Sequence, residues 1–133
     1  MYRVTKRIDF CYGHRLLDYD GICKHPHGHN AACEVEVRTD RLDERNMVAD
    51  FGDIKRLVKG WIDDELDHKM ILRHDDPLVK PLQALGEPIY LLDSNPTVER
   101  IAKLIFDQAR TLGLDVVQVT VWETPTSFAT YGD

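Results

Sequence analysis

The chain has 133 residues, of which 43% are apolar and 30% charged, with a formal net charge of −6. This length fits one domain, residues 1–133, with a moderate core, and the composition excludes a disordered chain. A general nucleic-acid binder or membrane-surface binder would carry a basic excess, so we expect neither partner. No stretch approaches the roughly 18 apolar residues of a membrane span. A local basic pocket for a phosphorylated small molecule stays compatible with these numbers.

The start of the chain and its cysteines predict a cytoplasmic protein. The first ten residues, MYRVTKRIDF, alternate like a strand and lack the apolar run of a signal peptide. Cys11, Cys23 and Cys33 are an odd number of cysteines without a secretory context. We therefore expect reduced thiols in a cytosolic compartment.

Two strands are predicted in the first third of the chain. Between Tyr2 and Tyr12 the even positions are mostly apolar and the odd ones mostly polar, the period of a half-buried strand. A turn at residues 18–21 follows, and residues 33–38 alternate in the same way. The charged turn at residues 40–46 ends this second strand.

A helix is predicted from Asp50, its expected N-cap, to Leu66. Apolar residues recur there at three- and four-residue spacing, which indicates one buried stripe. The segment 73–93 contains three prolines and is predicted to be an irregular excursion.

A second helix is predicted to begin in SNPTVE, with Asn95 as N-cap and Pro96 in its first turn, and to end at Gly113. Residues 117–123 alternate as a third strand, and residues 128–131 form a last short strand. The predicted order is ββααββ. It indicates a single α+β domain with an antiparallel sheet and helices on one face.

Residues 23–30, CKHPHGHN, contain three of the six histidines. Residues i and i+2 of a strand point the same way, so His27 and His29 can face one point. His29 shares its parity with Cys33, and His14 shares its parity with the apolar side of the first strand. Three imidazoles on the same side of a sheet predict an open catalytic zinc site, because structural zinc sites are closed by cysteines. The alternative is a loop of solvated histidines.

Two further histidines are not assigned to the metal. His25 has the same nominal parity, but Pro26 interrupts the ladder beside it, so we expect it behind the ligands or facing solvent. His74, in the charged run RHDD, is expected at the surface.

Six segments, FCYGHRL, CKHPHGHN, NMVADF, LDHKMIL, NPTVER and WETPTS, occur in the order found in the 6-pyruvoyltetrahydropterin synthase family. That family includes the bacterial 6-carboxytetrahydropterin synthases of queuosine biosynthesis. The resemblance runs from Ile8 to Tyr131. It implies the tunnelling fold (T-fold), in which sheets from several subunits assemble into a barrel, and a homohexamer of two trimers.

Carried over by position, the resemblance implies three zinc ligands, a catalytic thiol, a proton-transfer pair from a neighbouring subunit and a carboxylate that anchors the pterin. The zinc ligands are His14, His27 and His29, and the catalytic thiol is that of Cys23. Asp67 and His68 are the proton-transfer pair, and Glu123 is the carboxylate that anchors the pterin. The implied substrate is 7,8-dihydroneopterin triphosphate, whose side-chain hydroxyls can bind zinc as a Lewis acid. A thiolate can then remove a side-chain proton.

Asp67 and His68 are adjacent, and adjacent residues cannot meet on a regular helix face. We therefore expect either a distorted helix end or a division of labour in which only one of the pair touches Cys23. Glu123 shares its parity with the apolar positions of its strand, so we expect an inward carboxylate that needs a partner. A 2-aminopyrimidinone edge offers two parallel donors to such a group.

Each assignment has a structural alternative. Cys23 could be an inert loop thiol, and LDH only a helix terminus where a histidine meets the dipole. Glu123 could pair with a basic side chain. Cys11 and Cys33 are interpreted as packing residues.

Three features depart from the family pattern: Pro26, His25 and the length of segment 73–93. The fold and zinc site are unaffected, but the product is left open. Our first hypothesis is a 6-carboxy-5,6,7,8-tetrahydropterin synthase that releases triphosphate and acetaldehyde. The alternatives are a 6-pyruvoyltetrahydropterin synthase, which keeps the carbon chain, and a zinc-dependent module that binds a pterin or purine without turnover.

Overall fold

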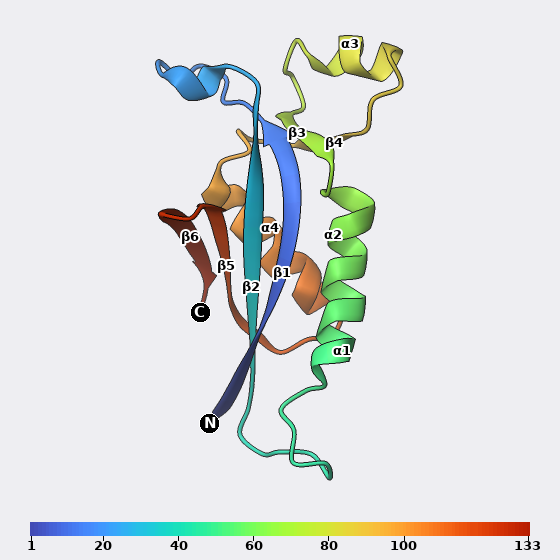
Figure 1. Cartoon of the computed structure of the whole chain (residues 1–133), viewed down its shortest axis with the longest axis vertical. Coiled ribbons are helices and arrows are strands. Elements are labelled where there is room, and N and C mark those ends of the chain that lie inside the picture. Colours follow the sequence, from blue (N-terminus) through green and yellow to red (C-terminus); the bar gives the residue numbers. More distant parts are fainter.

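The computed structural model describes all 133 residues and contains one six-stranded sheet in the order β4-β3-β1-β2-β5-β6. The strands are β1 (Tyr2–His14), β2 (His27–Thr39), β3 (Lys69–Arg73), β4 (Ile89–Leu92), β5 (Val116–Thr124) and β6 (Ser127–Gly132). The α-helices are α1 (Phe51–Ile54), α2 (Gly60–Glu65), α3 (Val79–Ala84) and α4 (Val98–Thr111). Figure 1 shows the long, curved β1–β2 hairpin between β5 and β6 on one side and α1–α2 on the other.

The β1–β2 hairpin is the longest ladder of the sheet. Its two strands pair antiparallel without a bulge, from Tyr2 opposite Thr39 to His14 opposite His27. From Ile8 to His14 the even positions of β1 are buried and the odd ones are more exposed, as the period of two predicted. Strand β1 ends two residues after the predicted end of the first strand. Strand β2 begins six residues before the predicted start of the second strand.

The predicted first helix is present but not uniform. Asp50 is its N-cap and accepts a hydrogen bond from the Gly52 amide, as predicted. A π-helical turn, Lys55–Lys59, joins α1 to α2. Burial recurs along this segment at a spacing of four residues, and this stripe faces the sheet core. The buried residues are Ile54, Val58, Ile62 and Leu66.

The N-terminus of the second helix differs from the prediction. Thr97, not Asn95, is the N-cap of α4, and its hydroxyl accepts a hydrogen bond from the Arg100 amide. Asn95 instead accepts from the Leu17 amide at 2.9 Å and donates to the Leu17 carbonyl at 2.8 Å. The Asn95 side chain, which the sequence predicts as the helix cap, is therefore used in a tertiary contact with Leu17 instead.

The predicted ββααββ order and purely antiparallel sheet are wrong in one region. Segment 73–93 is not wholly irregular, because it contains α3 and β4, and β3 directly precedes it. Strand β3 pairs parallel with β1 and with β4, so the sheet is mixed. The runs MILR and IYLL are too short to show a period, and the prolines between them resemble loop signals. Figure 1 shows this segment at the upper end of the molecule.

The core lies between the sheet and the two longer helical segments on one of its faces, as predicted. Val35, Val119 and Val121 of the sheet are fully buried in the same cluster as Ile101 and Ile105 of α4. None of the helices has the length and apolar character needed to cross a membrane.

Replacing Ile105 by alanine should destabilise the protein strongly. Ile105 is 0% exposed, and removing a buried isoleucine side chain costs about 2–5 kcal/mol. Ile22→Ala is the matched control, because Ile22 is 84% exposed and should change stability by less than about 0.5 kcal/mol. Denaturant unfolding at one fixed protein concentration measures both. Equal effects of the two variants would contradict this core assignment.

Candidate metal centre and active site

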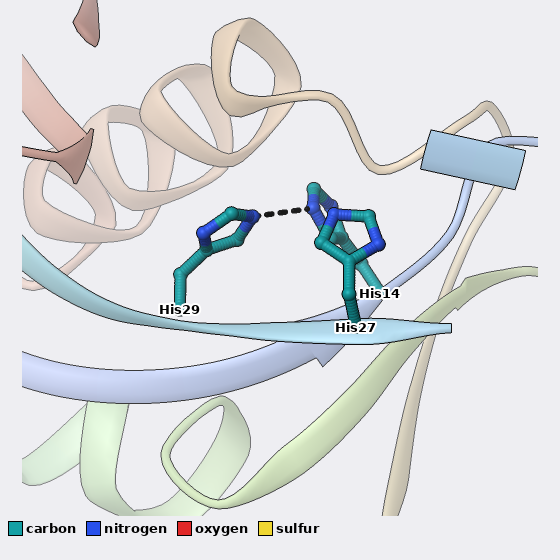
Figure 2. A group of neighbouring side chains, drawn as sticks. All are labelled: His14, His27 and His29. Carbon is teal, nitrogen blue, oxygen red and sulfur yellow. Dashed lines mark hydrogen bonds between the residues drawn. The ribbon is translucent and has the colours of Figure 1, made fainter. Parts of the chain in front are cut away.

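Three imidazoles from two strands meet on one face of the β1–β2 hairpin (Figure 2). His14 lies opposite His27, and Tyr12 lies opposite His29. Directly opposed residues of an antiparallel pair point to the same side, so this register places all three rings together. The ring centroids are 4.6–5.1 Å apart, and Nε2 of His14 is 3.2 Å from Nε2 of His29.

Backbone carbonyls orient two of these rings. The Nδ1 of His14 is 2.7 Å from the Pro96 carbonyl, and the Nδ1 of His27 is 2.7 Å from the His25 carbonyl. A carbonyl oxygen only accepts, so each Nδ1 carries a proton and donates it, and the Nε2 of each ring is left to face the cluster. Metal-binding histidines are commonly fixed in this way. His25 itself is exposed and contributes through its backbone, consistent with the expected place behind the ligands.

Glu123 adds a carboxylate to the same point. Its Oε1 is 3.3 Å from Nε2 of His14 and 3.3 Å from Nε2 of His29, and no lysine or arginine forms an ion pair with it. The predicted inward orientation is therefore confirmed, and its partners are imidazoles. Lone pairs and a carboxylate that converge in this way attract a cation.

Burial keeps two of the imidazoles, those of His14 and His29, in the form that binds a metal. His14 is 2% exposed, and burial lowers its pKa, although the Pro96 carbonyl and the Glu123 charge oppose that shift. The pKa of His29 is also lowered, again chiefly by burial. Both rings are therefore neutral at neutral pH. Nitrogen donors with an open position are the set found in catalytic zinc sites, so these residues fit that ion.

Tyr12 packs against two of these rings, with its ring centroid 5.1 Å from that of His14 and 5.7 Å from that of His29. The residue is buried, and its hydroxyl makes no hydrogen bond of ordinary length and angle, although the Glu123 carboxylate lies near it. Burial, and then the negative charge of Glu123, raise the pKa of this phenol far above its ordinary value. A neutral hydroxyl is thus held beside the histidine cluster.

Cys23 lies in the single 3₁₀ turn Ile22–Lys24, between the two strands that carry the histidines. It is half-buried, and its carbonyl accepts a hydrogen bond from the Leu16 amide at 2.9 Å. Its thiol belongs to neither of the two clusters of potential metal ligands in the chain. The structure therefore does not bring Cys23 together with Asp67 and His68 within one chain.

Asp67 and His68 follow the end of α2, and the helix end is distorted, the first of the two expected arrangements. His68 has a positive φ of 59°, which lets its Nδ1 lie 2.7 Å from Oδ2 of the adjacent Asp67. Burial alone would raise the pKa of Asp67, but hydrogen bonds from the Cys11 amide and His68 bring it below its ordinary value.

Cys11 is a neighbour of this pair that the sequence does not predict. Its thiol lies with the side-chain atoms of Asp67 and His68 that could bind a metal, so its expected role as a packing residue is wrong. Cys11 is half-buried at an odd position of β1, and the odd positions were predicted to face away from the core. That parity was the available signal. Cys33 is fully buried, as expected, and burial raises the pKa of its thiol. His74 is exposed, as expected.

Two contacts tie the loop after β1 to other elements. Asn95 makes the two hydrogen bonds to Leu17 described above, immediately before Pro96, whose carbonyl orients His14. Arg15 donates from Nε to Asp76 Oδ2 at 2.8 Å, and a second guanidinium nitrogen contacts the other oxygen. This two-point ion pair holds the excursion after β3 against the end of β1.

Asn95→Asp tests the first of these contacts. The carboxylate keeps the acceptor for the Leu17 amide but loses the donor and faces the Leu17 carbonyl, so we expect a stability loss of about 1–3 kcal/mol. Gln83→Glu, an amide-to-acid change at an exposed position, is the control and should be nearly neutral. Denaturant unfolding compares them. A neutral Asn95→Asp would show that the contact does not hold the loop.

Comparison with known proteins gives one family. The family model described as 6-pyruvoyl tetrahydropterin synthase matches residues 3–133. A protein of Rickettsia bellii named 6-carboxy-5,6,7,8-tetrahydropterin synthase is 35% identical, over 96% of this chain and 98% of its own. A protein of the same name from Aquifex aeolicus is 38% identical, over 82% of this chain and 75% of its own.

Solved structures agree with this result. An uncharacterized protein from Wolinella succinogenes superposes with a TM-score of 0.81 at 28% identity, covering 99% of this chain and 98% of that one. The 6-pyruvoyl tetrahydropterin synthase of Caenorhabditis elegans, at 22% identity, shares the fold with a TM-score of 0.74 over 99% of this chain and 95% of its own. The T-fold expected of one subunit is thereby confirmed. The chain belongs to the 6-pyruvoyl tetrahydropterin synthase family.

Proposed function

We propose that this protein is a zinc-dependent lyase acting on 7,8-dihydroneopterin triphosphate, with 6-carboxy-5,6,7,8-tetrahydropterin as its product. The observation that carries the proposal is the convergence of His14, His27, His29 and Glu123 on one point of the sheet. The name shared by the Rickettsia and Aquifex relatives supports the carboxy product. The product would serve 7-deazapurine (queuosine) biosynthesis.

The three histidines would hold the zinc, with a position left for substrate. Bound there, zinc supplies a Lewis acid that lowers the pKa of a coordinated hydroxyl. The chain's own share is to keep His14 and His29 neutral through burial, and to orient His14 and His27 through the two carbonyl hydrogen bonds. Glu123 would turn from the imidazoles to bind the paired N–H donors of the pterin, and so fix the ring.

Cys23 is the proposed base that removes a proton from the substrate side chain. It is placed on a short turn beside the strand that carries His27 and His29. Asp67 and His68 of a neighbouring chain would accept that proton from Cys23. The pair would have to come from another chain, because in their own chain they lie beside Cys11. Their mutual hydrogen bond keeps the imidazole oriented.

The free edges of the sheet support an assembly of subunits. Strands β4 and β6 are the two edges of the sheet, and each leaves one side without a partner strand. Barrel closure by further copies would satisfy both edges and deliver Asp67 and His68 to a neighbour's Cys23. We propose the homohexamer of two trimers that the sequence motifs imply.

Product analysis tests the proposal against its two alternatives. Zinc-loaded protein is incubated with 7,8-dihydroneopterin triphosphate, and the pterin and small products are identified by mass. We expect a carboxypterin with equimolar acetaldehyde and triphosphate. A pyruvoyl product without acetaldehyde would identify the 6-pyruvoyltetrahydropterin reaction, and bound but unchanged substrate would identify a binding module.

Cys23→Ala should remove turnover and little else. The three histidines complete the protein's share of the metal site, so zinc content, oligomer size and pterin binding should match those of the parent. Turnover should fall by roughly 10²–10⁴-fold, the usual contribution of a positioned acid–base group. Single-turnover kinetics and metal analysis measure these separately. Near-normal turnover would exclude the thiol as base.

Glu123→Gln should weaken substrate binding rather than chemistry. The amide keeps the shape but loses a charge-assisted pairing of about 1.5–3 kcal/mol, which corresponds to a rise in KM of roughly 10- to 100-fold. Steady-state kinetics on zinc-loaded variant measure KM and kcat together. An unchanged KM with an abolished kcat would assign Glu123 to the chemistry instead.

A further inference from the structure

A second group of potential metal ligands lies on the opposite face of the sheet from the three histidines. Cys11, Asp67 and His68 offer a sulfur, an oxygen and a nitrogen, all within 4.8 Å of one another. Residue 11 of β1 pairs with Asn30, one step from the Tyr12–His29 pair, and successive strand residues point to opposite faces. The two groups are therefore separated by the thickness of the sheet.

Backbone hydrogen bonds build this second group. The Cys11 amide donates to Asp67 Oδ1 at 2.9 Å, and the Cys11 carbonyl accepts from the His68 amide at 2.8 Å. His68 also holds the left-handed φ of 59°, which costs free energy in a residue other than glycine. The loop after α2 is thus fixed to β1 at the residue that carries the thiol.

The donor set suits a borderline or soft divalent cation. A thiolate, an imidazole and a carboxylate are all ordinary zinc ligands, and thiolate disfavours magnesium and calcium. Ligand atoms on a tetrahedral zinc lie roughly 3.3–3.8 Å apart, given bonds of about 2.0–2.3 Å. The observed group needs only a small closure to reach that spacing. A cavity of about 510 Å³, lined in part by Cys11, Asp67 and His68, leaves room for water as a further ligand.

We infer that Cys11, Asp67 and His68 form a second site for a zinc-class cation, and that its occupation inhibits the enzyme. The metal competes for the His68 imidazole and for Asp67, and so breaks their 2.7 Å hydrogen bond. Asp67 and His68 can then no longer exchange a proton with Cys23 of a neighbouring chain. The binding site stands on the geometry alone, whereas the inhibition rests on the proposed function.

Cobalt(II) titration of metal-free protein tests the binding. A thiolate ligand gives a near-ultraviolet charge-transfer band that a site of three imidazoles cannot give. We expect two cobalt ions per chain and this band in the parent protein. Cys11→Ser should lose the band and keep one cobalt, which also shows that the variant folds. His68→Asn, in which asparagine tolerates the positive φ, should likewise lose the band.

Two control variants separate this site from the first. Cys23→Ser and His29→Ala should both retain the band, because neither residue belongs to the second group. A band that disappears in Cys23→Ser but persists in Cys11→Ser would place the thiolate at the histidine site and overturn the inference. Absence of any band in the parent protein would overturn it as well.

Turnover at increasing zinc tests the inhibition. The parent protein should lose about 10²-fold in rate once the second site fills, the order expected for loss of an acid–base pair. Cys11→Ser should have the parent's basal rate and resist excess zinc. Cobalt binding without inhibition would leave the second site standing and contradict the role of Asp67 and His68 in the proposed function.

Discussion

The register between β1 and β2 is the constraint on which the site depends. His14 opposite His27, and Tyr12 opposite His29, place three imidazoles on the helix-covered face. A shift of one residue would turn one strand's histidines to the other face and would also expose its apolar positions. The same alternation that buries Ile8 and Phe10 thus fixes the positions of the three histidines. Core packing and ligand geometry cannot be changed independently along this hairpin.

Segments distant in the sequence then fix the rings in detail. The Pro96 carbonyl, just before α4, orients the His14 ring. The Asn95 side chain binds Leu17 and so holds the loop that follows β1. Arg15 and Asp76 join that loop to the segment between β3 and α3. The entrance to α4 therefore serves the site as well as the helix. This explains why the helix is capped by Thr97, two residues later than the sequence predicted.

Local periodicity was sufficient to predict the long elements and the facing of the histidines. It predicted His14, His27, His29 and Glu123 on one side, because parity is a property of each strand by itself. It failed for β3 and β4, whose apolar runs are too short to show a period. For Cys11 it indicated the face away from the core but not the neighbours, because that thiol meets Asp67 and His68 only when the end of α2 reaches β1. Pairings between distant segments are not encoded in the period of either segment.

The central claim is that the hairpin register holds one zinc ion with three imidazoles. Zinc content per chain, measured after dialysis in a Cys11→Ser background that leaves only this site, tests it directly. We predict one zinc per chain, retained when exposed His74 is changed to alanine and lost when His29 is changed to alanine. Retention of stoichiometric zinc by the His29→Ala protein would contradict the account.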